Sequence, residues 1–354
     1  MDRRNGEGAM LKSDDTQLED VPFVSVIVPI RNEARYIRGC LESITRQDYP
    51  HKRMEILIAD GMSTDGTCEV VQSYAELDIL MHWVYNPGRI VPTGMNLALR
   101  QARGDILVRV DGHCEIAPDY ISSCVKHLQD SDADGVGGSM DTIGETPLSE
   151  TIAVAMSSPF GVGGSAFRTV RAVTMYADTV PFPAYSRDIV ERAGLYDEEL
   201  VRNQDDEYNY RIRELGGKIL LASDVKSKYY SRGSLKKLWK QYFQYGYWKV
   251  RVLQKHPRQM SLRQFVPLVF VVSLFLSGLL AVITSWGNWL LAFLAGSYLI
   301  ANLVASMYTA SQRGWKHLSL LPVCFSILHI SYGAGFLVGF VWFWDRWGDK
   351  RGRT

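Results

Sequence analysis

The chain has 354 residues, of which 47% are hydrophobic and 22% charged, and its formal net charge is +1. This length allows one large domain or two ordinary ones, and the composition is ordinary for a globular protein. Five scattered cysteines without a Cys-x-x-Cys pair indicate neither a disulfide framework nor a structural zinc site.

Polar and charged residues make up the first segment, 1–20, which contains no apolar core that could serve as a signal peptide. We expect a disordered tail here. We also expect the chain that follows it to stay in the cytoplasm until a later segment meets the membrane.

Three short apolar runs, Val24–Pro29, Glu55–Asp60 and Asp105–Val110, predict buried parallel strands. Between the first two, apolar residues recur at helical spacing and predict a helix over residues 34–47. Strands and helices that alternate in this way predict a mostly parallel, right-handed α/β sheet. No Gly-x-Gly-x-x-Gly motif follows the first strand, which argues against a dinucleotide-binding dehydrogenase.

Acidic residues stand at or just after the ends of these strands, namely Glu33, Asp60 and Asp111. Ligands of such sheets bind beyond the carboxyl ends of the strands, so one crevice could collect all three. Asp60 precedes a turn-rich stretch, 61–67, that has two interpretations. Asp60 accepts a hydrogen bond from a nucleobase N–H, or residues of the stretch cap the helix that follows. Both can hold, because different residues carry them.

The tripeptide Asp111-Gly112-His113 offers a carboxylate oxygen and, two positions on, an imidazole nitrogen. Together these could hold the divalent ion that accompanies a nucleotide-diphosphate sugar and stabilises the departing diphosphate. Mn²⁺ tolerates an imidazole ligand better than Mg²⁺ does. The alternative interpretation is an Asp-Gly turn that binds no ion.

Three consecutive carboxylates, Asp205, Asp206 and Glu207, stand just before a predicted helix. Such a cluster can supply the general base that proton transfer near neutral pH requires. The alternative is that the acidic residues stabilise the N-terminus of the helix.

A basic segment, residues 226–263, contains eleven Lys or Arg residues and no Asp or Glu. Within it, residues 235–256 interleave basic and aromatic side chains, which predicts a helix at a membrane interface. Three apolar stretches follow, each about as long as the ~20 residues that cross a bilayer: 265–284, 289–309 and 318–343. An anionic membrane surface, rather than nucleic acid, is therefore the expected partner. A solvated basic face and buried helices of a soluble protein are the alternatives.

These features divide the chain into five predicted segments: a tail (1–20), an α/β domain (21–230), a basic aromatic interfacial helix region (231–263), a transmembrane region (264–345) and a basic tail (346–354). The positive-inside rule places the α/β domain in the cytoplasm, beneath the cell (inner) membrane. Three full crossings would leave the basic tail outside. A break at residues 331–335 could instead form a re-entrant pair and return the tail to the cytoplasm. Both topologies are open at this point.

Taken together, residues 24–250 resemble the family 2 glycosyltransferases of the GT-A fold, most of all the succinoglycan-biosynthesis type of bacterial glucosyltransferase. The run from Val26 to Glu33 is similar to the family's opening strand, which implies that Pro29 and Glu33 belong to the nucleoside site. Residues 60–67 are similar to the family's Asp-Asp-Gly-Ser-Thr-Asp-Gly-Thr element, with its second Asp and its Gly replaced. This implies that Asp60 contacts uracil.

The donor motifs continue in the family's order. Residues 86–96 match the loop and helix beside the donor diphosphate, which assigns Arg89 and Asn96 to that site. Asp111 and His113 stand at the two ends of the family's Asp-x-Asp metal motif, with His in place of the second Asp.

Two later motifs complete the resemblance. Gln204–Arg211 aligns with the family's Glu-Asp-x-Asp/Glu…Arg pattern, with Gln204 in place of Glu, which makes Asp205 the implied catalytic base. Gln244 and Trp248 are spaced like the Gln-x-x-Arg-Trp motif of processive synthases, which assigns both residues to the donor site. Tyr247 replaces its Arg, which favours the addition of a single sugar.

The resemblance implies an inverting glycosyltransferase that moves one sugar, with glucose favoured, from a UDP-sugar to a polyprenyl-diphosphate-linked saccharide in exopolysaccharide or cell-surface glycan assembly. Mn²⁺ or Mg²⁺ is the implied cofactor. The expected partners are the UDP-sugar, the polyprenyl-linked acceptor, the lipid bilayer and other glycan-assembly enzymes, but no nucleic acid. The alternatives are a processive polysaccharide synthase, a polyprenyl-phosphate monosaccharide transferase and a non-catalytic nucleotide-sugar-binding membrane subunit.

Overall fold

The structure is a computed structural model that describes residues 20–349, except 75–78, 171 and 232. Most of the expected N-terminal tail and the last residues of the basic tail, 350–354, lie outside the described residues. The described residues divide into two compact units. The first comprises those of Met1–Ser139, Val173–Tyr196 and Ile212–Ser227, and the second those of Met140–Ala172, Asp197–Arg211 and Lys228–Thr354.

Four neighbouring parallel strands form one part of the sheet in the first unit. They are β1 (Val24–Ile30), β2 (Met54–Asp60), β3 (Leu80–Tyr85) and β4 (Ile106–Arg109). Every residue of β1 and β2 is buried, as the apolar runs predicted. The register pairs Ile30 with Asp60, and Asp60 with Tyr85, so β1, β2 and β3 end at one edge of the sheet. The loops that follow these strands therefore lie together.

The helices that connect these strands are α2 (Ile37–Thr45), α3 (Thr67–Gln72) and α4 (Val91–Leu99), with a 3-10 turn, η1 (His51–Arg53), before β2. The helix predicted over residues 34–47 is present as α2. Its buried face consists of the residues that recur at helical spacing: Ile37, Cys40, Leu41 and Ile44.

The rest of the sheet is mixed, because β8 (Ala184–Ser186) pairs antiparallel with both β4 and β6 (Gly135–Ile143). Within the described residues, the sheet has nine strands in the order β3-β2-β1-β4-β8-β6-β9-β5, and β7 pairs with β9. The remaining strands are β5 (Cys114–Ile116), β7 (Met175–Tyr176) and β9 (Ile219–Tyr230), and the helices are α5 (Tyr120–Asp130) and α9 (Arg187–Ala193). The predicted α/β fold is thus confirmed, with a mixed sheet.

The second unit is mainly helical. Its shorter helices are α6 (Pro147–Met156), α7 (Pro159–Val162), α8 (Ala166–Thr169) and most of α10 (Gln204–Glu214). The predicted basic aromatic helix is present as α11 (Leu235–Lys255). After it come η2 (Pro257–Gln259), η3 (Leu262–Phe265), α12 (Val266–Ile283), α13 (Ser285–Arg313), η4 (Trp315–His317) and α14 (Leu321–Trp342).

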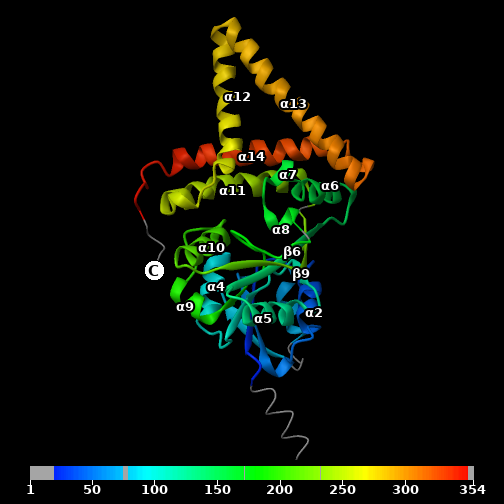
Figure 1. The fold of residues 1–354 in the computed structure, drawn as a ribbon, viewed down its shortest axis with the longest axis vertical. Coiled ribbons are helices and arrows are strands. Elements are labelled where there is room, and N and C mark those ends of the chain that lie inside the picture. The colour runs from blue at the N-terminus through cyan, green and yellow to red at the C-terminus, as the bar shows by residue number, and fades with distance from the viewer. Residues whose placement is uncertain (1–19, 75–78, 171, 232, 350–354) are drawn as a thin grey trace, which may run out of the picture. The chain divides into compact units, whose positions relative to one another are not determined.

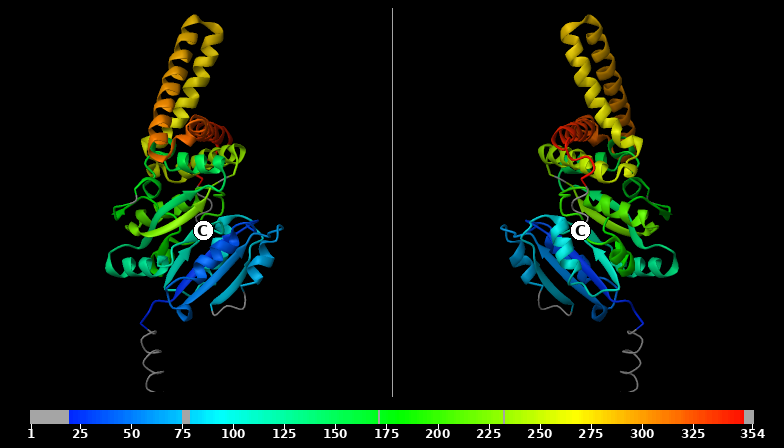
Figure 2. Two further views of the ribbon diagram at one scale, coloured as in Figure 1. Left: turned by 90° about the vertical axis from the view of Figure 1, so that its right-hand side faces the viewer. Right: turned by 90° about the vertical axis from the view of Figure 1, so that its left-hand side faces the viewer.

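Three described helical stretches are long and apolar enough to cross a membrane, namely Leu262–Ile283, Ser285–Arg313 and Leu321–Trp342. The three predicted apolar segments are thus confirmed as helices. Within the second unit, α12 and α13 form a hairpin, and α14 runs beside α11 across the base of that hairpin (Figures 1 and 2).

Candidate functional site

The loops that follow β1 and β2 are joined by reciprocal hydrogen bonds between side chains and backbone. The Asn32 N–H donates to Ser63 Oγ at 2.9 Å, and the Thr64 N–H donates to Asn32 Oδ1 at 2.8 Å. The Glu33 N–H donates to Thr67 Oγ1 at 2.8 Å. Asn32 takes a left-handed conformation with φ 56°, which asparagine tolerates better than most residues. These bonds fix the backbone that carries Glu33.

Asp60, the last residue of β2, is 3% exposed. Its carboxylate accepts hydrogen bonds from the Ser63 hydroxyl at 2.6 Å and from the Ser63 N–H at 3.2 Å. Asp60 therefore organises the turn in this structure. A carboxylate has about four acceptor positions, so this contact is compatible with the predicted nucleobase contact. Pro29, the other predicted residue on a strand, lies beside Ala59 in the buried β1–β2 pair.

The loop after β3 carries the two residues assigned to the diphosphate. Arg89 is exposed, has φ 58°, and accepts a hydrogen bond through its carbonyl from Arg31 Nη1 at 3.1 Å. Asn96 on α4 is 1% exposed. Its Oδ1 accepts a hydrogen bond from the Tyr196 N–H at 2.7 Å, and its Nδ2 donates to the Tyr196 carbonyl at 2.9 Å. Asn96 thus holds the chain at Tyr196, and its contact with the donor stays a prediction.

Asp111 and His113 follow β4, and each has a charged or polar partner. Arg109 is 7% exposed and donates to Asp111 Oδ1 at 2.8 Å from Nε and to Oδ2 at 3.2 Å from Nη2. His113 Nδ1 lies 3.1 Å from Glu33 Oε1. Glu33, which the resemblance assigned to the nucleoside, therefore contacts the predicted metal ligand in this structure.

The chemistry of Asp111 and His113 fits a divalent ion with oxygen and nitrogen ligands. Their side chains are 22% and 15% exposed, so both are partly open to a ligand. A carboxylate on the far nitrogen of an imidazole is the usual support of a metal-bound histidine, and Glu33 stands in that position relative to His113. Among the described residues, no group of three or more His, Cys, Asp or Glu forms a complete metal site. The diphosphate would therefore have to supply further ligands.

The carboxylates predicted to include the base lie in the second unit, in the first turn of α10. Asp206 forms an ion pair with Lys249, and Glu207 is fully buried. Asp205 is exposed, accepts the N–H of Asp206 at 3.0 Å, and has no ion-pair partner among the described residues. Asp205 is thus the member of the cluster that is available to a substrate.

Glu207 is held by the side chains of Arg211 and His256. Arg211 donates from Nε at 2.7 Å and from Nη2 at 3.0 Å, and His256 Nε2 lies 3.0 Å from the same carboxylate. Burial alone would raise the pKa of Glu207, but the bonds from His256 and Arg211 outweigh it and leave the pKa below its usual value. Glu207 is therefore a structural carboxylate that anchors the start of α10.

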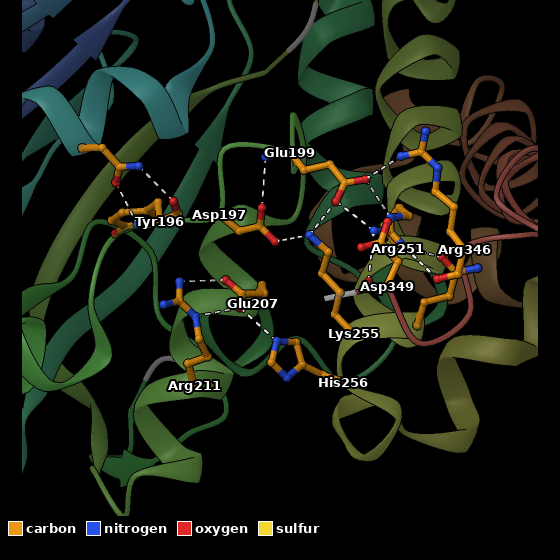
Figure 3. A network of polar contacts seen from close by, with 12 residues as sticks. Tyr196, Asp197, Glu199, Glu207, Arg211, Arg251, Lys255, His256, Arg346 and Asp349 are labelled. Atoms are coloured by element: carbon orange, nitrogen blue, oxygen red, sulfur yellow. Dashed lines mark hydrogen bonds and ion pairs between the residues drawn. The ribbon is translucent and has the colours of Figure 1, made fainter. Parts of the chain in front are cut away.

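Basic residues of α11 reach the segment that precedes α10 (Figure 3). Arg251 has no exposed surface and donates to both oxygens of Glu199 at 2.8 Å. Lys255 pairs with Asp197 and, at 2.6 Å, with Glu199. Together with Lys249, these residues make a buried ion-pair network that fixes residues 197–207 on α11. They are therefore engaged within the protein and not with a lipid surface.

Gln244 and Trp248 lie on the same helix. Gln244 Oε1 accepts from Arg202 Nε at 3.3 Å, and the Trp248 ring packs 5.7 Å from that of Phe343. Gln244 thus contacts the segment that leads to Asp205, whereas Trp248 packs against the residue after α14. A donor contact for either residue stays a prediction.

The partners of the predicted residues were not foreseen from the sequence. Arg109 could have been noticed as a charge within an apolar strand, because a buried charge needs a partner. Glu199, the carboxylate partner of Arg251, is distant from it in the sequence, and no local pattern indicates this pairing.

Comparisons with known proteins show the family to which the chain belongs. The model of the family Glycosyl transferase family 2 matches residues 25–193. The chain is 31% identical over 313 residues to the succinoglycan biosynthesis protein ExoA of Rhizobium meliloti, across 88% of this chain and 93% of that protein. It is 28% identical to a dolichyl N-acetyl-alpha-D-glucosaminyl phosphate 3-beta-D-2,3-diacetamido-2,3-dideoxy-beta-D-glucuronosyltransferase of Methanococcus voltae, across 90% of this chain and 97% of the relative.

A solved structure shows the same fold. It is a mannosyltransferase from Pyrobaculum calidifontis in complex with GDP-Man and Mn²⁺, with a TM-score of 0.57 and 20% identity, across 94% of this chain and 95% of that one. The mixed sheet is thus a GT-A-type glycosyltransferase fold. The chain belongs to glycosyl transferase family 2, and it is a glycosyltransferase.

Proposed function

We propose that this glycosyltransferase adds a single sugar to a polyprenyl-diphosphate-linked saccharide at the cytoplasmic face of the cell membrane. UDP-glucose is the favoured donor. Family membership supports the reaction type. The acceptor class is supported by the Methanococcus relative, which is named for a dolichyl-linked acceptor, and by three apolar helices beside the basic helix α11. Exopolysaccharide or cell-surface glycan assembly is the process in which such a product is used.

The exposed carboxylate of Asp205 is the observation that carries the mechanism. In a single in-line displacement, this group takes the proton from the acceptor hydroxyl as the hydroxyl oxygen attacks the anomeric carbon. The bond from that carbon to the diphosphate oxygen breaks, UDP leaves with the bonding electrons, and the configuration is inverted. Such general-base help is typically worth ~10²–10⁴ in rate. Asp206 and Glu207 are held in ion pairs with Lys249 and Arg211, and they position the helix turn that carries Asp205.

The first unit supplies the donor site. We assign Pro29, Glu33 and Asp60 to the nucleoside, and Arg89 and Asn96 to the diphosphate. Asp111 and His113 would hold a divalent ion, Mn²⁺ or Mg²⁺, which when bound neutralises negative charge on the departing diphosphate. Arg109 orients the Asp111 carboxylate, and Glu33 orients the His113 imidazole.

The test is transfer of radiolabel from a panel of UDP-sugars into organic-extractable lipid, with membranes that contain the protein. Asp205→Asn should lower turnover by ~10²–10⁴, while UDP binding stays within about twofold. Asp188→Asn is the matched control, because Asp188 is also a carboxylate in the first turn of a helix and is largely exposed. Equal activity of the two variants would mean that Asp205 only stabilises its helix, and would overturn the mechanism.

The same assay separates the proposed reaction from processive synthesis. Tyr247, which stands where processive synthases have Arg, packs with its ring 4.9 Å from that of Phe343. We therefore expect a labelled product that is longer than the acceptor by one sugar. A ladder of longer products would contradict single addition, and label on polyprenyl phosphate alone would indicate a monosaccharide transferase.

A further inference from the structure

The three apolar helices differ in how much of their surface the protein covers. In the most apolar stretches of α12 and α13, 6% and 11% of the residues are buried, whereas 44% are buried in that of α14. Many large apolar side chains of α12 and α13 are exposed, for example Phe275 at 60% and Phe293 at 70%. Only the hairpin therefore presents the apolar surface all round that a bilayer would solvate.

The contacts of α14 show that it passes the base of the hairpin and does not run along it. Its first half meets α13 through Asn302, which donates to the Pro322 carbonyl and to Ser326 Oγ, both at 3.0 Å. At its middle, a Cβ on Gly333 would lie 2.2 Å from the carbonyl oxygen of Pro267, in the first turn of α12. Figure 2 shows α14 end-on while the hairpin is seen lengthwise.

For the rest of its length α14 lies directly on α11. A Cβ on Gly335 would lie 2.0 Å from the Phe243 carbonyl oxygen, and one on Gly339 would lie 2.6 Å from that of Tyr247. The two helices therefore run in the same direction with their backbones in contact. Such close approach between helices requires small residues.

The position of α11 sets the depth of α14. α11 buries Lys249, Arg251 and Lys255 in ion pairs with carboxylates of residues 197–206. A charged group at the centre of a bilayer is costly, so this helix belongs at the membrane surface. Because α14 lies along α11, α14 also belongs near the surface and not across the bilayer.

The residues after α14 provide an independent argument from connectivity. Arg346 Nη1 lies 3.1 Å from Glu199 Oε1, and the Arg346 carbonyl accepts from Arg251 Nη1 at 3.3 Å. All three stretches found to be long and apolar enough to cross lie between Glu199 and Arg346, within the part of the chain that the structure describes. Since Glu199 and Arg346 are in contact, the number of crossings between them must be even. Three crossings are thus incompatible with the structure.

Exposed tryptophans lie at both the tip and the base of the hairpin in the second unit, whereas charged residues lie only near its base among these positions. Trp286 and Trp289 are exposed at the tip of the hairpin, whereas the exposed tryptophans at its base are Trp239, Trp315, Trp342, Trp344 and Trp347. Tryptophan gathers at both interfaces of a membrane. The 18 residues of α12 extend about 27 Å, close to the ~30 Å hydrocarbon core. Arg263 and Arg313 flank the base, and the tip at residues 284–289 has no charged residue.

We infer that α12 and α13 are the two membrane crossings, and that α14 lies in the plane of the interface as a platform between α11 and the lipid. The outer face of α14, away from α11, contacts lipid at the boundary between acyl chains and headgroups. This is the leaflet on the side of the basic residues. The described residues that follow α14 return to the side of the membrane on which Glu199 lies. This topology does not depend on which donor or acceptor the enzyme uses.

The depth of α14 is tested with the full chain in liposomes that contain anionic lipid, by electron paramagnetic resonance of single nitroxide labels on a background without the five native cysteines. The labels replace Val323, near the start of α14, and the partly exposed Ala334, at its middle, which are 11 residues apart. Leu290 and Ala301, both exposed and also 11 residues apart, are the matched control on α13. We expect equal, shallow depths of ~5–10 Å for the α14 pair, whereas the label on Ala301 should lie clearly deeper than the label on Leu290. A label on Ala334 that lies ~10 Å or more deeper than the label on Val323, out of the ~16 Å that separates them along the helix, would overturn the proposal.

The sidedness is tested in intact cells with a membrane-impermeant maleimide on the same background. Asn288→Cys at the hairpin tip should react from outside, whereas Trp344→Cys should react only after permeabilisation. A Trp344→Cys variant that reacts from outside, or an Asn288→Cys variant that reacts only after permeabilisation, would contradict the inferred topology. Retained transferase activity of each variant shows that the labelled protein is folded, and failure of the proposed sugar transfer would not affect either measurement.

Discussion

Arg251 of α11 and Glu199 of the loop before α10 are 52 residues apart and form a bidentate ion pair, with both hydrogen bonds at 2.8 Å. Arg251 has no exposed surface, and 21% of the Glu199 side chain is exposed. The same guanidinium donates to the carbonyl of Arg346. One side chain thus joins the segment that carries Asp205, the interfacial helix and the chain after α14.

Replacing Arg251 should destabilise the second unit. Arg251→Met removes the bidentate partner of Glu199, although Lys255 and Arg346 still contact this carboxylate. Removal of one partner of a buried pair costs up to about 3–5 kcal/mol. We expect the lower end, because Glu199 keeps some exposure to water. The Tm of the detergent-solubilised protein, followed by tryptophan fluorescence, should fall by several degrees. The exposed Arg258→Met should change it little, and equal effects of the two would argue against the network.

The pair itself is isolated by a double-mutant cycle. If Arg251 and Glu199 act as a unit, Arg251→Met combined with Glu199→Gln should cost less than the sum of the two single changes. Additive losses would mean that each residue stabilises the protein through other contacts.

Helix packing at the interface depends on Gly335. Even the methyl group of Gly335→Ala would stand 2.0 Å from the Phe243 carbonyl oxygen, so α14 must separate from α11. Overpacking of this kind typically costs 1–3 kcal/mol or more. Gly296→Ala on α13 is the matched control, because a Cβ there meets nothing within 4 Å. We expect a lower Tm and a lower yield of folded protein for Gly335→Ala only, and the reverse order would contradict the packing described.

The contact between Glu33 and His113 predicts a dependence on the divalent ion. If Glu33 orients the imidazole, Glu33→Gln should raise the Mn²⁺ concentration for half-maximal transfer by about 10–100-fold, with a smaller change at saturating Mn²⁺. Glu69→Gln, an exposed glutamate in the same unit, should behave like the unmodified enzyme. If Glu33→Gln instead raises only the KM for the UDP-sugar, Glu33 contacts the nucleoside as the resemblance implied.

Acid should destabilise the protein partly through Glu207. Despite its burial, the bonds from His256 and Arg211 hold its pKa below the ordinary value of 4.5. A carboxylate with a lowered pKa in the folded state contributes stability above the unfolded-state pKa, and this contribution is lost as the pH falls through the folded-state pKa. We therefore expect the Tm to fall as the pH is lowered below about 4.5, and to fall less in Glu207→Gln. Parallel pH profiles for the two proteins would exclude this role.

Much of the first unit could be predicted from the sequence because its signals are local. The β-branched runs identified β1 and β2, the spacing of Ile37, Cys40, Leu41 and Ile44 identified α2, and the order of short motifs indicated the family. The positions of Asp60 and Asp111 at strand ends followed from the same patterns. What Glu33 contacts did not, because the His113 imidazole is 80 residues away in sequence.

The sequence by itself determined the family, the α/β sheet, the basic aromatic helix and the three apolar helices, since composition and periodicity act within single elements. Only the tertiary structure decided which charges are buried and which remain available, because an ion pair such as Arg251 with Glu199 needs partners from distant segments. It also decided the role of α14. A helix of 22 mostly apolar residues has the same composition whether it crosses a bilayer or lies along its surface, and only the contacts with α11 and the base of the hairpin distinguish the two.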